Sequence, residues 1–414
     1  MKRNYYIVAL IMLTFFVISF LTNVIGALND DFINGFHISG FLASFYPFAF
    51  FIAYGLVSIP TSMLLEKYKE RKIMVVGFIV SFLGSLLLAA APTALTTAIS
   101  LFLVGSGMAM LQVIINPLLR TSGGEEHYAF NSVLAQLIFG GASFLSPLVY
   151  SYFVVHFNDT NNGFLTIFHS IVPANLPWVS LYWLFAVISL LMIVIIRSTK
   201  FPVVELKEDE KAGTWATHFA LFKNPVVVTF FIAMICYVGT EQGLNNNISE
   251  FLKTYHGYNS KTIGAQALSH FWGLMLVGGV VGLFLLKVAD SRKVLVGFVI
   301  AALICLSAGL FGPGGVALIA LPMVGFFASV MYPIIFSLAL NSVSEDHGSF
   351  AGILVTGIIG GAIIPPIIGG IGVLADLRVG MSFLYLTLGY ILYIGFSAKP
   401  LITNQTVFDK KIKE

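Results

Sequence analysis

Charged residues are scarce in this sequence. Asp, Glu, Lys and Arg make up 10% of its 414 residues, against about 25% in an average soluble domain. A water-soluble protein of this length could not cover its surface with so few charges. Collagen-like and disordered chains are excluded as well, because 58% of the residues are hydrophobic and no block of like charges occurs. The sequence therefore predicts a protein that crosses a lipid bilayer several times.

Cysteine and catalytic motifs are almost absent. Cys236 and Cys305 lie in apolar stretches without metal-ligand spacing, so we interpret them as buried thiols and expect no metal site. No Walker motif, His-Glu-x-x-His or Gly-x-Ser-x-Gly sequence occurs, and the glycine clusters at 278–282 and 357–361 favour close packing of membrane helices. We therefore predict no enzyme and no cofactor. A net charge of only +3 also argues against nucleic acid as a partner.

Long apolar runs fill most of the chain. A helix needs about 20 apolar residues to cross the hydrocarbon core, and continuous runs exclude the alternating strands of a membrane β-barrel. Twelve such runs occur, near residues 5–29, 38–65, 73–91, 96–119, 128–154, 178–197, 224–251, 262–287, 293–311, 315–341, 349–374 and 380–398. The predicted fold is an all-α membrane protein with twelve transmembrane helices in two pseudo-symmetric six-helix halves.

Lysine and arginine are distributed unevenly between the loops. If the N-terminus is cytoplasmic, the cytoplasmic segments hold all of the 22 Lys and Arg residues except Lys253, Lys261 and Arg378. Positive charge is retained on the cytoplasmic side of a membrane. Both termini are therefore predicted to be cytoplasmic, in a plasma membrane of the bacterial inner-membrane type.

The most polar stretch of the chain separates six spans from six. We predict an N-terminal half at 1–198, a cytoplasmic linker at 199–223, a C-terminal half at 224–398 and a cytoplasmic tail at 399–414. The linker is either plain solvated chain or carries a short surface helix through Trp215 and Phe219.

Prolines recur at matching places in the two halves. Span four is expected to break at Asn116-Pro117 and span ten at Tyr332-Pro333. Repeated halves with kinked helices are typical of transporters that rock between two states. Chance placement would give the same pattern, since many membrane helices contain a proline.

Span seven carries the densest set of polar residues at membrane depth. Glu241 and Asn245 lie one turn apart, as do Gln242 and Asn246. Polar side chains are costly in the bilayer and need a partner or a wet cavity. We favour a cavity lining that binds a polar solute or a coupling cation over a structural hydrogen-bond network between helices.

Span one ends in Asn29, Asp30 and Asp31. The carboxylates are either the exposed end of the helix or, for Asp30 above all, a group that takes up a proton in a half-buried vestibule. Spans one and seven thus both carry carboxylates, Asp30 and Asp31 in the first and Glu241 in the second.

Amides and aromatic residues complete the candidate site. Gln112 and Asn116 are one turn apart and offer donors and acceptors suited to sugar hydroxyls, although Asn116 could instead bond carbonyls freed by Pro117. Gln136 lies deep in span five. Trp272 could stack on a sugar ring or simply pack in the core.

Several motifs resemble the fucose–proton symporter family of the major facilitator superfamily, and more closely its glucose/galactose branch. The matching segments are Leu28-Asn29-Asp30, Leu111-Gln112-Val113 with Asn116-Pro117, Tyr237-Val238-Gly239-Thr240-Glu241, Tyr332-Pro333-Ile334-Ile335-Phe336-Ser337-Leu338 and Gly360-Gly361-Ala362-Ile363-Ile364-Pro365-Pro366. In fucose symporters the residue matching Asp30 is a proton-linked carboxylate. The residue matching Gln112 is a glutamate there, whereas the glucose/galactose branch carries glutamine, so the resemblance points away from fucose.

The resemblance implies cation-coupled symport, with H⁺ or Na⁺, of a monosaccharide into the cell by alternating access. The expected sugar is a hexose such as glucose or galactose, or an N-acetyl sugar given the amide-rich run of span seven. The alternatives are an exporter or facilitator of another small polar solute, and a transporter-like sugar sensor. We expect a monomer whose polar side chains converge on one wet chamber. The predicted sugar-binding residues are Asn29, Gln112, Asn116, Gln136, Gln242, Asn245 and Trp272, and the predicted ion-coupling residues are Asp30 and Glu241.

Overall fold

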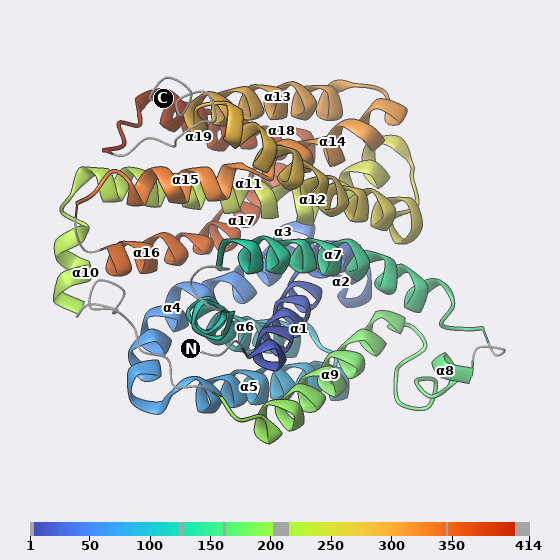
Figure 1. Ribbon diagram of the computed structural model, residues 1–414. Coiled ribbons are helices and arrows are strands. Elements are labelled where there is room, and N and C mark those ends of the chain that lie inside the picture. The colour runs from blue at the N-terminus through green and yellow to red at the C-terminus, as the bar shows by residue number, and fades with distance from the viewer. Residues whose placement is uncertain (1–3, 124–127, 160–162, 202–214, 345–346, 402–414) are drawn as a thin grey trace. The chain divides into compact units, whose positions relative to one another are not determined.

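The protein is described here by a computed structural model that covers residues 4–123, 128–159, 163–201, 215–344 and 347–401. The side chains of a few helix residues in these ranges, Asn116 among them, lie outside the described part. The described residues form helices joined by short loops (Figure 1). The α-helices are α1 (Tyr5–Thr22), α2 (Ile25–Phe36), α3 (Gly40–Ala43), α4 (Phe45–Tyr68), α5 (Glu70–Ala90), α6 (Ala94–Gly123), α7 (Tyr128–Val155), α8 (Gly163–Thr166), α9 (Ser180–Ser198), α10 (Trp215–Leu221), α11 (Pro225–His256), α12 (Ala265–Val288), α13 (Ser291–Phe311), α14 (Gly314–Ala328), α15 (Met331–Leu340), α16 (His347–Thr356), α17 (Gly360–Leu374), α18 (Leu377–Ser382) and α19 (Leu384–Ser397). Shorter turns are the 3₁₀ helices η2 (Pro177–Val179) and η5 (Gly357–Ile359) and the π-helical turn η4 (Ser260–Gly264).

Twelve stretches of helix are long and apolar enough to cross a membrane. They are Tyr5–Phe36, Gly40–Leu65, Glu70–Ala90, Ala94–Ile115, Leu134–Val155, Pro177–Ser198, Pro225–His256, Ser260–Val288, Ser291–Phe311, Gly314–Leu340, Ser349–Leu374 and Leu377–Ser397. The prediction of an all-α protein with twelve membrane helices is confirmed.

Short polar side chains mark the first turn of several helices. Asn4 accepts a hydrogen bond from the backbone N–H of Ile7 at 3.2 Å at the start of α1. Asp290 caps α13 and Asp376 caps α18 in the same way, each at 2.9 Å. These oxygens satisfy N–H groups that have no partner within the helix, so each apolar run begins at a defined residue.

Some spans are interrupted and others run through their prolines. Span ten stops at Ala328 and resumes at Met331, two residues before Pro333, because a proline lacks the N–H that would bond the carbonyl four residues earlier. The break expected at Asn116-Pro117 is wrong: α6 is continuous to Gly123. A proline inside a membrane helix is tolerated where neighbouring groups satisfy the freed carbonyl.

The first span also contains a joint. α1 ends at Thr22 and α2 begins at Ile25, with Asn23 buried between them. Asn23 donates a hydrogen bond to Ser143 of α7 at 2.8 Å, and Ser146 of α7 donates to the carbonyl of Phe20 at 2.7 Å. These bonds fasten the joint to α7.

The chain divides into two compact units. Unit 1 contains Met1–Glu205 and Asn245–Ser269, and unit 2 contains Leu206–Leu244 and His270–Glu414. Unit 1 therefore joins the first six spans with the end of α11, the turn η4 and the start of α12. The division into halves at 1–198 and 224–398, with a linker at 199–223 and a tail from 399, stays a prediction. Within the linker the structure describes the short helix α10, while residues 202–214 lie outside the described part.

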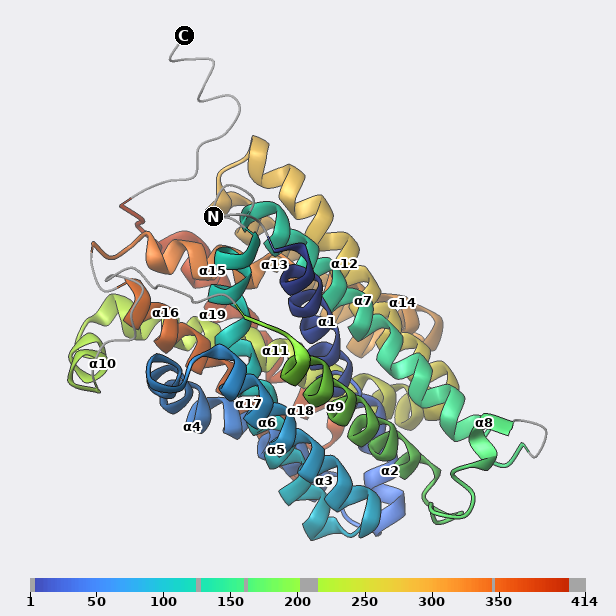
Figure 2. The ribbon, with the colours of Figure 1, turned by 60° about the horizontal axis from the view of Figure 1, so that its bottom comes forward.

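Glycine allows close approach of helices within each unit. In unit 1, α5 packs against α6 and α9 (Figure 2), and a side chain at Gly107 of α6 would collide with the carbonyl of Gly77 and with Ser81, both on α5. In unit 2, Gly360 of α17 lies against the backbone of Ile235 in α11. Such contacts hold membrane helices together where there is no hydrophobic driving force between them.

Candidate functional site

A cluster of ionisable side chains lies in unit 1 around the end of the first span. Asn29, Asp30 and Asp31 of α2 are 8%, 6% and 5% exposed. They are buried and do not form an exposed helix end. Burial of two adjacent carboxylates is costly unless each is paired and hydrogen-bonded.

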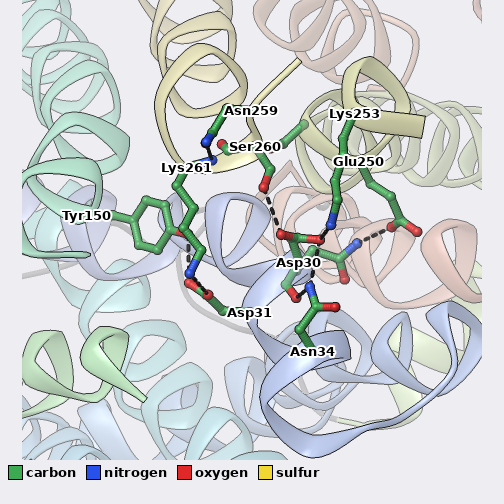
Figure 3. A network of polar contacts seen from close by, with 11 residues as sticks. Asp30, Asp31, Asn34, Tyr150, Glu250, Lys253, Asn259, Ser260 and Lys261 are labelled. Atoms are coloured by element: carbon green, nitrogen blue, oxygen red, sulfur yellow. Dashed lines mark hydrogen bonds and ion pairs between the residues drawn. The ribbon is translucent and has the colours of Figure 1, made fainter. Parts of the chain in front are cut away.

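Asp30 is surrounded by donors on both carboxylate oxygens (Figure 3). Lys253 of α11 forms an ion pair with Oδ1, and Asn34 of α2 donates to the same oxygen at 2.9 Å. The hydroxyl of Ser260, in η4, donates to Oδ2 at 2.7 Å. Asp30 is thus held as an ion by residues from three elements.

Asp31 has a separate set of partners. The Nζ atom of Lys261 lies 3.0 Å from Oδ1, and the hydroxyl of Tyr150 in α7 donates to Oδ2 at 2.7 Å (Figure 3). The side chains of Lys253 and Lys261 are 44% and 39% exposed, whereas those of the aspartates are buried. The cluster therefore extends from the buried face of α2 to partly exposed residues.

A third carboxylate belongs to the same cluster. Glu250 of α11 is half-buried and accepts a hydrogen bond from the Nδ2 atom of Asn29 at 2.7 Å. We call this set the Asp30 cluster. Its members are Asn29, Asp30, Asp31, Asn34, Tyr150, Glu250, Lys253, Ser260 and Lys261.

Asn29 and Asp30 were predicted from the sequence, whereas the other half of the cluster was not. Glu250, Lys253 and Lys261 come at the polar end of a span and in the loop after it, where charges are common. A usable signal was the spacing within α11, since Glu250 lies one turn beyond Asn246 on the same helix face.

A second polar group lies in unit 2 around Glu241 of α11. The hydroxyl of Tyr237 donates to its Oε2 atom at 2.7 Å, and the Nε2 atom of Gln242 donates to Oε1 at 3.0 Å. Tyr332 of α15 packs its ring against Tyr237, with centroids 5.7 Å apart. Among the described residues none forms an ion pair with Glu241, so its charge is met by neutral donors alone.

The remaining predicted residues are placed as follows. Asn245 is fully buried in unit 1, where Gly26 of α2 lies against its backbone carbonyl. Trp272 is 2% exposed and meets Phe271 edge-on. Gln112 is half-buried and Gln136 is exposed on α7, while the side chain of Asn116 lies outside the described residues. Convergence of all these side chains on one chamber stays a prediction.

Asn246 is a further candidate, which was predicted to lie on the polar face of span seven but not to bind the ligand. It is 3% exposed, and neither its amide nitrogen nor its amide oxygen has a hydrogen-bond partner among the described residues. A buried amide without partners costs about 1–3 kcal/mol for each unpaired group. Such an amide is a candidate partner for a polar ligand or a water molecule.

Comparison with known proteins identifies the family. A model for the Major Facilitator Superfamily matches residues 10–366. The glucose/galactose transporter of Brucella abortus biovar 1 (strain 9-941) is 27% identical over 400 residues, which cover 95% of this chain and 94% of the relative. The L-fucose-proton symporter of Escherichia coli (strain K12) is 25% identical over 385 residues, or 89% and 87% of the two chains. These matches confirm the resemblance that the sequence motifs indicate.

Solved structures agree on the fold. A crystal structure of the E. coli fucose:proton symporter aligns with a TM-score of 0.66 at 22% identity, covering 95% of this chain and 98% of the other. A bacterial homologue of the human lysosomal transporter Spinster aligns with a TM-score of 0.74 at 15% identity, covering 95% and 96%. The protein is a membrane transporter and not an enzyme, as the sequence predicts. The chain belongs to the Major Facilitator Superfamily.

Proposed function

We propose that the protein carries a monosaccharide into the cell together with a proton or a sodium ion. The proposed sugar is a hexose such as glucose or galactose, or an N-acetyl sugar. The observation that carries the proposal is the end-to-end match to a glucose/galactose transporter, which covers 95% of this chain. A match over nearly the whole length of both chains supports the same kind of transport cycle.

The proposed orientation follows from the distribution of lysine and arginine. The protein lies in the bacterial inner membrane with both termini in the cytoplasm, and the loop after α11 faces the outside. The protein acts as a monomer made of two six-helix halves, as the sequence predicts.

Sugar binding is assigned to amides and one indole. Amides offer donors and acceptors together and carry no charge, which suits a neutral ligand rich in hydroxyls. The proposed sugar-binding residues are Asn29, Gln112, Asn116, Gln136, Gln242, Asn245 and Trp272, to which the unpaired amide of Asn246 is added.

Ion coupling is assigned to Asp30 and Glu241. Glu241 is the sharper case, because its carboxylate has neutral donors and no cation beside it among the described residues. A proton or a sodium ion would remove that charge and lower the cost of enclosing it. Asp30 already has Lys253, so its part in coupling is to exchange that ion pair for the coupled cation.

Transport by purified protein in liposomes tests the proposal. We expect uptake of radiolabelled glucose or galactose against a concentration gradient when an inward pH or sodium gradient is imposed, and loss of accumulation when the gradient is collapsed. Fucose and N-acetylglucosamine in the same panel define the specificity. Sugar binding without flux would favour a sensor, and flux that ignores both gradients would favour a facilitator.

A further inference from the structure

The Asp30 cluster has an unequal number of charges. Its acidic members are Asp30, Asp31 and Glu250, and its basic members are Lys253 and Lys261. Each aspartate has a lysine of its own. When all five groups are ionised, the cluster therefore holds one more negative charge than positive, and Glu250 is the carboxylate left over.

The contacts of Glu250 are a hydrogen bond and no ion pair. Its Oε2 atom accepts from Asn29, and no lysine, arginine or histidine of the described chain lies within ion-pair distance. The charges that act on it are Asp30 of α2, which repels it, and Lys253 of α11, whose ammonium is bound to Asp30. From α3 it meets Gly40, which carries no charge.

We propose that the Asp30 cluster is a gate on the outer side of the transporter and that it closes with a proton on Glu250. The outer location rests on the orientation proposed above. The cluster joins the end of span one to the end of span seven and the start of span eight. Asp30 contacts Lys253 and Ser260, which lie 223 and 230 residues further along the chain. For a solute to enter from outside, these contacts must separate.

A proton fits this place better than a sodium ion. Sodium needs several oxygen ligands, and the oxygens of Asp30 and Asp31 already accept from lysine, serine, asparagine and tyrosine donors. The Lys253 ammonium also repels a metal cation. A proton removes the surplus charge without requiring additional ligands, and the protonated carboxyl keeps its bond from Asn29 through its carbonyl oxygen.

The proposed gate couples the proton to the cycle, and in this respect it rests on the proposed symport. Protonation of Glu250 from outside removes the repulsion that resists closure. Loss of that proton towards the inside leaves three carboxylates beside two lysines, which favours separation of the closed contacts and return of the empty carrier.

Distance measurements between spin labels test the gate without any sugar. Leu42 of α3 and Thr254 of α11 are exposed and lie outside the cluster, and both would be changed to labelled cysteines in a protein with Cys236→Ala and Cys305→Ala. In this background we expect the short-distance population to increase as the pH falls. A population that does not respond to pH would overturn the proposal.

Two substitutions should change the pH dependence of closure in opposite directions. Glu250→Gln imitates the protonated side chain, so the short distance should dominate at every pH. Lys253→Gln increases the surplus of negative charge, so closure should require more acid than in the parent. Retention of the parent's pH dependence in Glu250→Gln overturns the proposal, and so does closure of Lys253→Gln at a higher pH than the parent.

A histidine variant separates this gate from another source of pH dependence. His256 is also titratable and lies near this end of α11, where its ring contacts Phe251 and Tyr258. His256→Gln should keep the parent's response, and loss of the response in this variant, with the response of Glu250→Gln unchanged, assigns the proton elsewhere. Because the readout needs no sugar, a working gate in a protein that transports no hexose would refute the proposed function alone.

Discussion

Single side chains with incomplete pairing are the clearest functional signals in this molecule. Many buried polar groups in the described chain have a hydrogen-bond partner, as Asn23 has in Ser143. Glu241 and Asn246 differ, because the first has neutral donors only and the second has no partner for its amide. A folded protein retains such costly groups where a ligand or an ion completes them.

We expect Glu241→Gln to abolish uphill accumulation of sugar while exchange along a gradient continues. The amide cannot take up or release a proton, yet it keeps the size of the carboxyl group and can still accept from Tyr237. Accumulation should fall by at least about tenfold, which corresponds to 1.4 kcal/mol of coupling. Counterflow in liposomes measures exchange, and Cys236→Ala, five residues earlier on α11, is the matched control. Full accumulation by the glutamine variant would exclude Glu241 from coupling.

Asn246→Ala should weaken sugar binding without loss of stability. If the amide bonds the sugar, its removal costs about 0.5–1.5 kcal/mol, or up to about tenfold in KM. The unfolding temperature should stay the same or rise, because no protein partner is lost. Asn23→Ala is the contrasting variant: it removes a bond to Ser143, so it should lower the unfolding temperature. The reverse pattern in the two variants would make Asn246 a structural residue.

At the scale of helices, close packing through glycine carries the stability. A methyl group at Gly360 would collide with the backbone of Ile235, so α17 and α11 could not keep their present spacing. We expect Gly360→Ala to destabilise the protein by about 1–3 kcal/mol, the usual range for overpacking. Gly389 of α19 has open space around its Cα atom, and Gly389→Ala should therefore be neutral. Thermal unfolding in detergent compares the two, and equal unfolding temperatures would contradict this account of the α11–α17 contact.

The membrane-spanning helices could be predicted from the sequence, but only some of their breaks could. The twelve spans follow from apolar runs of sufficient length, because the bilayer sets that length and little else competes with it. Helix breaks were less predictable. Pro333 follows an interruption whereas Pro117 lies within an unbroken α6, since the outcome depends on whether neighbouring groups satisfy the freed carbonyl.

The candidate site was predictable only in part for a similar reason. Asp30 stands out in an apolar sequence, but its partner Lys253 lies 223 residues away and only the packing of α2 against α11 brings them together. From the sequence alone, Lys253 cannot be distinguished from the charged residues that are common near the ends of membrane spans. Trp178 illustrates the same limit, because a position next to a loop gives no hint that it is 1% exposed among Phe32 and Phe36.

At the scale of the whole molecule, sidedness is the property to establish first. A cysteine in place of Thr254, in a chain lacking Cys236 and Cys305, should react from outside intact cells with a maleimide that cannot cross membranes. A cysteine in place of Lys399 should react only after the membrane is permeabilised. Both positions are exposed in the structure, so accessibility does not limit labelling. The opposite pattern would invert the orientation and place the Asp30 cluster on the cytoplasmic side.

The joint at Asn23 has a mechanical consequence. The first span has 32 residues, and a helix of that length without a break would have to tilt as one rod. The break leaves the twelve residues of α2 as a short lever, and the hydrogen bond from Asn23 to Ser143 fixes its pivot on α7. Asp30 and Asp31 lie on this arm, so opening of the proposed gate would require only α2 to turn about this pivot, and α1 need not move with it.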